Sequence, residues 1–241
     1  MNNVDRDGFP GTQGESGEFD GGDTAAILGG MIALSKFGQL ESYTPLRLVQ
    51  LQSRLFKHGA PIRHPDSLKW YGCNDRFSRD QLVATLCGLV VVPNQVFCAL
   101  LFAAHKSRWF LTAWNTRKNG VMGAPKKFPD ITLFEVWGLW IRIMRPWWRH
   151  LVLWFFDIET LIGAIHWRLF RKDRVTRNHM LVMLTCMNHS PTPALWLAYR
   201  ITDWPEMVLR WKDHCTAVRE YDTAGLFLCA AFPKMYGRNA K

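Results

Sequence analysis

Residues 78–106 read SRDQLVATLCGLVVVPNQVFCALLFAAHK, and this stretch indicates the fold class. It carries no charged residue from Leu82 to Ala104, and Pro93-Asn94-Gln95 interrupts its centre. Proline followed by polar residues is typical of a turn. The stretch therefore predicts two apolar helices, over 79–92 and 95–106, that form an αα-hairpin.

The same apolar run has a second interpretation. Its length would suffice to cross a bilayer, and the Trp-rich segment from Trp147 to Phe170 would be a further candidate span. That segment contains Asp157 and Glu159, however, and charged side chains are costly in hydrocarbon. We therefore expect two soluble helices, with integral membrane insertion as the alternative.

Helical patterns continue on both sides of this hairpin. Asp23-Thr24 offers capping chemistry for a helix to about Phe37, and Pro45 suits the first position of a helix to about Lys57. Strand signals are weak, with Gly88–Val92 as the one β-like run. Beyond the basic loop 114–130, helices are predicted over 132–144, 146–170, 175–189, 192–202 and 204–219. The prediction is one all-α domain, 1–241, of packed αα-hairpins and long polar loops. A partial α/α toroid is one arrangement that such hairpins can form.

Charge is distributed unevenly along the chain. The formal net charge is +10, but residues 1–30 carry six acids and one base, a net of −5, which leaves +15 for the remainder. A basic body attracts nucleic acid, anionic lipid or an acidic polymer, although a solvated surface explains it equally well. The six cysteines show no metal-binding spacing, and the N-terminus has no secretory signal pattern. A cytoplasmic location is the simplest expectation, with membrane association as a variant of it.

The opening segment 1–24 is acidic and rich in glycine. Because glycine permits tight backbone turns, its acids can converge on one place. Such a cluster suits general acid–base chemistry, or a hard cation such as calcium at Asp5, Asp7 and Asp20. No metal or other cofactor is required by this pattern. The competing explanation is that Asp23 caps a helix while the other acids are solvated.

Two more polar blocks are candidates to complete this site. In Ser78-Arg79-Asp80-Gln81, Arg79 can bind a carboxylate or an anionic ligand, while capping alone would explain Ser78 and Asp80. In Arg63-His64-Pro65, a loop histidine can transfer protons near neutral pH, although a lone histidine is more often simply exposed. Asn115 and Arg117 can bind a hydroxylated or anionic ligand, or belong to a solvated loop. The twelve tryptophans stack on sugars in one interpretation and fill the core in the other.

The blocks Asp5-Arg6-Asp7-Gly8-Phe9, Asp20-Gly21-Gly22-Asp23-Thr24-Ala25, Arg63-His64-Pro65 and Ser78-Arg79-Asp80-Gln81 occur in this order. The first half of the chain thereby resembles a group of uncharacterised bacterial and phage proteins, and this resemblance implies no mechanism. More loosely, the blocks are similar to loop motifs of α/α-toroid glycan-processing enzymes, whose acids gather at one end of a ring of hairpins. The chain is short for a complete six-hairpin ring.

The leading functional hypothesis is a carbohydrate-active protein, either a glycoside hydrolase or a sugar-binding relative. Hydrolysis requires two carboxylates, one protonated and one ionised. The candidate catalytic residues are Asp23 and Asp80, supported by Asp7 or Asp20, and the candidate substrate-binding residues are Arg63, His64, Arg79, Gln81, Asn115 and Arg117. The alternative is a non-enzymatic phage or mobile-element interaction protein that binds an acidic partner, nucleic acid or a membrane surface. Oligomeric state is not indicated by the sequence.

Overall fold

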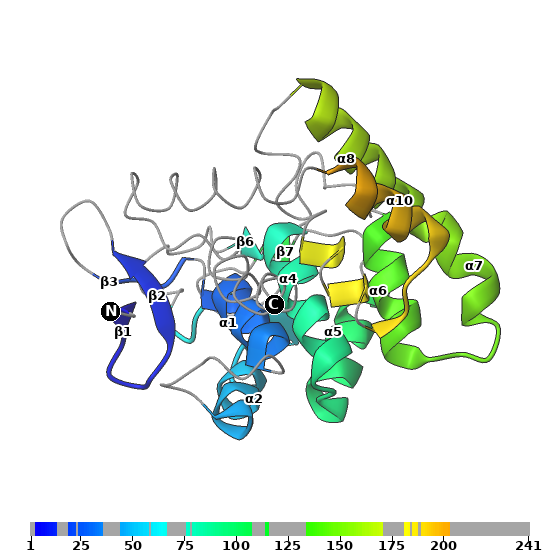
Figure 1. The fold of residues 1–241 in the computed structure, drawn as a ribbon. Coiled ribbons are helices and arrows are strands. Elements are labelled where there is room, and N and C mark those ends of the chain that lie inside the picture. The colour runs from blue at the N-terminus through cyan, green and yellow to red at the C-terminus, as the bar shows by residue number, and fades with distance from the viewer. Residues whose placement is uncertain are drawn as a thin grey trace.

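The computed structural model describes residues 3–13, 19–22, 24–35, 44–57, 59–66, 76–77, 79–107, 114–115, 134–170, 181–183, 185–187 and 189–202. This part of the chain is mainly helical, which confirms the all-α prediction (Figure 1). The helices are α1 (Thr24–Ser35), α2 (Pro45–Ser53), α4 (Arg79–Val91), α5 (Gln95–Ser107), α6 (Phe134–Met144), α7 (Arg149–Phe156), α8 (Ile158–Phe170) and α10 (Pro193–Ile201).

The opening segment forms a small sheet, where a loop without strands was predicted. Its strands β1 (Asn3–Val4), β2 (Pro10–Gln13) and β3 (Phe19–Asp20) pair antiparallel in the order β1-β2-β3. Strands this short show no alternation of apolar and polar residues, so their pairing leaves no sequence signal. Two further antiparallel pairs join β4 (Phe56–Lys57) to β5 (Ala60–Pro61), and β6 (Arg76–Phe77) to β7 (Trp114–Asn115).

The two helices predicted over 79–92 and 95–106 are confirmed as α4 and α5, but they do not pack closely on each other as a hairpin: α4 packs mainly on α1 and α6, whereas α5 contacts α2, β4 and β5. The chain leaves α4 at Val91 and enters α5 at Gln95. Asn94 starts α5, because its side-chain oxygen accepts the Phe97 N–H at 3.2 Å. The β-like run of valines at the end of α4 is helical, because burial against neighbouring helices outweighs the strand preference of valine.

Helices α1 and α4 pack side by side and run parallel. Gly29 of α1 lies against Ala84, and a Cβ atom added to Gly29 would stand 2.3 Å from the Ala84 carbonyl oxygen. One turn further along α4, Gly88 lies against Gly29 and also against Ile32, which follows Gly29 by about one turn of α1. Contacts that advance in the same direction along both chains require parallel helices. The N-terminal ends of α1 and α4 therefore lie together, and so do their C-terminal ends.

Helix α6 continues this layer by packing on α4. Trp140 of α6 is fully buried and donates its indole N–H to His105 of α5 at 2.9 Å. After α6 the chain turns at Arg145 and Pro146 and then forms α7 and α8 in place of the single helix predicted over 146–170. The break falls at Asp157, which is buried and forms an ion pair with Arg142.

Each helix that the structure describes is too short or too polar to reach across a bilayer.

The close α1–α4 contact yields a stability prediction. Gly29→Ala should lower the free energy of unfolding by about 3 kcal/mol, because the added methyl group would overlap backbone that cannot move independently. Urea denaturation followed by circular dichroism measures this change. The matched control is Gly59→Ala, where a Cβ meets nothing within 4 Å but φ is +76°; backbone strain alone should cost about 1 kcal/mol there. Equal losses in the two variants would contradict the proposed overlap.

Candidate functional site

The sequence-predicted blocks meet at the shared N-terminal end of α1 and α4. Two side chains converge on the Gly22 carbonyl oxygen: Gln81 donates to it from Nε2 at 2.9 Å, and Arg63 donates from Nη1 at 3.3 Å. Thr24, the first residue of α1, donates its hydroxyl to the Pro10 carbonyl oxygen at 2.7 Å. The opening segment is thus attached to both helix starts and to the loop that contains Arg63.

Asp5 and His64 organise the turn at the beginning of this segment. One carboxylate oxygen of Asp5 accepts the N–H groups of Asp7 at 2.9 Å and Phe9 at 2.7 Å. The other oxygen lies 3.1 Å from His64 Nε2. His64 Nδ1 accepts the Asp66 N–H at 3.1 Å, so the ring proton of neutral His64 resides on Nε2 and is donated to Asp5.

His64 is buried against aromatic rings. Its side chain is 1% exposed, and its ring centroid lies 5.1 Å from that of Phe9 and 5.7 Å from that of Phe19. Burial lowers the pKa of His64 below its usual value of 6.5, although nearby carboxylates, chiefly Asp5, act in the opposite direction. The ring is therefore neutral at pH 7 and holds the loop together. Direct proton transfer to a ligand by His64 stays a prediction.

Asp7 lies at the surface of the same turn. Arg54 pairs with its carboxylate at 3.1 Å, and Arg47 donates to its backbone carbonyl at 2.9 Å. Both side chains of the Asp7–Arg54 pair are nearly half exposed, so the pair adds little stability. Gly8 adopts φ +88°, a conformation that favours glycine, and this allows the chain to reverse above Arg47.

The calcium hypothesis meets a specific obstacle in this arrangement. Both Asp5 oxygens accept hydrogen bonds, and an Asp7 oxygen faces an arginine, so a cation would have to displace these donors. In the described ranges no group of three or more His, Cys, Asp or Glu side chains is placed to hold a metal ion. The Asp20 side chain lies outside the described part of the chain.

The remaining predicted residues are placed only in part. Arg79 and Asp80 form the first turn of α4, while Asn115 belongs to β7, and in each case the backbone alone is described. Asp23 and Arg117 lie outside the described residues. The structure thus joins Arg63 and Gln81 at Gly22, and Asp5 and His64 at the turn 5–9. Whether the two principal acids face each other stays a prediction.

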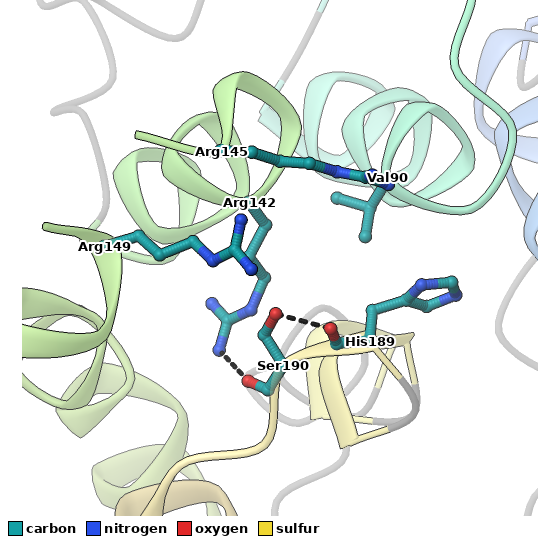
Figure 2. Close-up of a pocket in the computed structure, with 6 residues that line it drawn as sticks. All are labelled: Val90, Arg142, Arg145, Arg149, His189 and Ser190. Carbon is teal, nitrogen blue, oxygen red and sulfur yellow. Dashed lines mark hydrogen bonds between the residues drawn. The ribbon is translucent and has the colours of Figure 1, made fainter. Parts of the chain in front are cut away.

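A second polar concavity, which the sequence reasoning missed, lies where α4 and α6 both end. It is a cavity of about 220 Å³ lined by Val90, Arg142, Arg145, Arg149, His189 and Ser190 (Figure 2). Arg142 is almost fully buried and forms a two-bonded pair with Asp157, with Nη1–Oδ1 at 3.0 Å and Nη2–Oδ2 at 2.7 Å. It also donates to the Ser190 carbonyl oxygen at 3.0 Å.

The sequence signal for this pocket was weak but present. Arg142, Arg145 and Arg149 recur at intervals of three and four residues, the spacing of one helical face, but Pro146 interrupts the helix between them. His189 and Ser190 come from a distant part of the chain, so only the tertiary structure could add them.

The buried thiols of Cys87 and Cys186 are unreactive at neutral pH. Burial raises the pKa of Cys87 well above its usual value and raises that of Cys186 to about 12. Because the thiolate is the reactive form, neither residue is a candidate nucleophile at neutral pH.

Comparison of the chain with protein-family models, with curated proteins and with solved structures gives no significant match to any of them.

The buried His64 predicts a pH dependence of stability. Its folded-state pKa lies below the unfolded value, so its contribution is complete above about pH 6.5 and is lost as the pH falls through that value, where the unfolded chain takes up a proton first. We expect the free energy of unfolding to decrease between about pH 7 and pH 5, and to decrease less in His64→Gln. Denaturant titrations at both pH values measure this. The same loss in wild type and variant would contradict the assignment.

Proposed function

We propose that the shared N-terminal end of α1 and α4 is the active site of a carbohydrate-active protein, most directly a glycoside hydrolase. The observation that supports this is the hydrogen bond from Gln81 to the Gly22 carbonyl oxygen. In the sequence, Asp80 directly precedes Gln81, and Asp23 directly follows Gly22. The bond therefore connects the immediate neighbours of the two candidate acids, which lie 57 positions apart in the chain.

The chemistry would depend on keeping two carboxylates in different protonation states. Glycoside hydrolysis needs one acid to protonate the leaving oxygen and one carboxylate to act as base or nucleophile. The N-terminal dipoles of two parallel helices favour ionised carboxylates, while mutual repulsion between nearby acids raises the pKa of one of them. Arg79 would orient a carboxylate or the substrate, with Asp7 or Asp20 in support. Arg63, His64 and Gln81 hold the loop that forms this end.

Substitution of the two acids tests this proposal. Asp23→Asn and Asp80→Asn should each lower the rate of glycan cleavage by about 100-fold or more, because an amide cannot transfer a proton or act as nucleophile. The measurement is release of reducing ends from a panel of polysaccharides and oligosaccharides.

The matched control is Asp66→Asn, which removes the same charge in the neighbouring loop after His64. It should retain activity. Wild-type activity in both Asp23→Asn and Asp80→Asn would remove these residues from the mechanism. If the wild type cleaves no glycan of the panel, hydrolysis is ruled out for these substrates, and calorimetry then measures whether the protein binds glycans.

We propose a second function, association with an anionic membrane surface from the cytoplasmic side, on a different observation. Large apolar side chains are exposed along α7 and the turn before it: Trp147 is 87% exposed, Leu151 70% and Trp154 50%. Leu151 and Trp154 are three residues apart on one helix face. Exposed clusters of this kind mark interaction surfaces, and tryptophan beside arginine is typical of helices that lie in the lipid interface.

Vesicle binding tests the second function. Wild-type protein should co-sediment with vesicles of phosphatidylcholine mixed with phosphatidylglycerol, and much less with phosphatidylcholine alone, because a chain of net charge +10 gains from anionic lipid. Leu151→Ser should weaken this binding about tenfold through lost apolar burial. The control Val96→Ser alters a residue on α5 that is 73% exposed and should bind as wild type does. Equal effects of the two substitutions would argue against α7 as the contact surface.

A further inference from the structure

The arginine pocket lies at the opposite end of α4 from the predicted catalytic acids. Its lining residues come from the last turn of α4 (Val90), the end of α6 (Arg142 and Arg145) and the start of α7 (Arg149) (Figure 2). The segment His189–Ser190 closes the remaining side. Four separate parts of the chain thus surround one cavity of about 220 Å³.

The pocket carries an excess of positive charge. Asp157 neutralises Arg142 through two hydrogen bonds. Arg145 and Arg149 form no ion pair with any acid that the structure describes, and the Arg149 side chain donates from Nε to Nε2 of the neighbouring His150 at 3.1 Å. Two helices end here, and each C-terminus carries about half a negative charge. Two uncompensated guanidinium groups exceed that total, so the cavity is net positive.

Arg145 occupies a backbone conformation that disfavours arginine. Its φ is +51°, in the left-handed region, at the position after the last residue of α6 and before Pro146. Glycine or asparagine is the usual residue at such a helix end, because a larger side chain crowds the backbone there. A strained residue whose side chain lines a pocket indicates that the side chain has a use beyond folding.

Arg142 is held in a fixed place within this pocket. Its side chain is 1% exposed, and the Asp157 carboxylate that binds it also accepts the Thr192 hydroxyl at 2.6 Å. The Ser190 carbonyl oxygen binds the same guanidinium. The rear wall is therefore rigid, while Arg145 is exposed and Arg149 is half-buried at the mouth. The pocket therefore has a fixed inner side, formed by Arg142, and two solvent-accessible cations, Arg145 and Arg149.

We propose that this pocket is a phosphate-binding site in which Arg145 and Arg149 contact the phosphate oxygens. Guanidinium groups bind phosphate through paired N–H donors, and two of them can neutralise a phosphate monoester or diester. The inference deepens the second proposed function, since Arg149 begins the helix whose apolar face would enter the bilayer, and a lipid headgroup is then one source of the phosphate. Free phosphate compounds are the other source.

Inorganic phosphate is the probe for the pocket itself. At tenfold excess over its dissociation constant, phosphate should raise the Tm of the wild-type protein by about 3 °C relative to chloride at equal ionic strength. Arg145→Gly and Arg149→Ala should lose most of this shift. Arg145→Gly should also keep or raise the Tm without phosphate, because glycine adopts the left-handed conformation without strain.

The matched control is Arg168→Ala, which removes an exposed arginine of α8 that does not line the pocket. It should keep the wild-type phosphate shift, and any general salting-out effect of phosphate should be common to all variants. A wild-type shift that persists in both pocket variants, or that Arg168→Ala loses equally, would overturn the proposal. So would the absence of any phosphate-dependent shift in the wild type.

Vesicles then distinguish the two sources. If the phosphate belongs to a lipid, each pocket substitution should weaken binding to phosphatidylglycerol-containing vesicles about fivefold, while Arg168→Ala should weaken it less. If the source is a free compound, vesicle binding should be unchanged in variants that lose the phosphate shift, and the pocket assignment stands. Vesicle binding by the wild type without any phosphate shift would leave the membrane function intact and remove the phosphate site.

Discussion

The contact between Gly29 and the backbone of α4 is the constraint on which the arrangement depends. No other residue type fits at Gly29 without displacing Ala84, and Gly88 fits against the same turn of α1. Two helices that approach this closely can pack only in one register. Because that register is parallel, residues that precede α1 and residues that begin α4 lie at one end of this helix pair, although α2 and the strands β4, β5 and β6 come between them in the sequence.

The parallel packing of these helices also places acidic and basic side chains at opposite ends of the helix layer. The helix N-terminal ends, with their partial positive charge, are joined by the acidic opening segment, and Asp5 accepts backbone and imidazole hydrogens there. The C-terminal ends of α4 and α6 are accompanied by Arg142, Arg145 and Arg149. The two proposed sites follow from this polarity: carboxylate chemistry at one end and anion binding at the other.

The buried Arg142–Asp157 pair secures the second end. It connects α6 to the junction of α7 and α8, and through the Thr192 hydroxyl it reaches the start of α10. Loss of one partner would leave an almost fully buried charge without its counter-ion, which is strongly destabilising, whereas the exposed Asp7–Arg54 pair could be lost with little effect. The two pairs therefore differ in geometry, with two hydrogen bonds in the buried pair and one in the exposed pair, and they differ greatly in their contribution to stability.

Local signals in the sequence by themselves determined the helical class, the break between α4 and α5 and the start of α2 at Pro45, because apolar runs, proline and capping side chains act within a few residues. They also indicated polar blocks that the structure brings into contact, since Arg63 and Gln81 both donate to the Gly22 carbonyl oxygen. Only the tertiary structure decided that α1 and α4 are parallel and that three short strands pair in the opening segment. It also decided that His64 is buried and holds its loop, and that arginines on both sides of Pro146 line one pocket with His189 and Ser190. These features depend on how closely distant backbones approach, and no pattern along the chain encodes that distance directly.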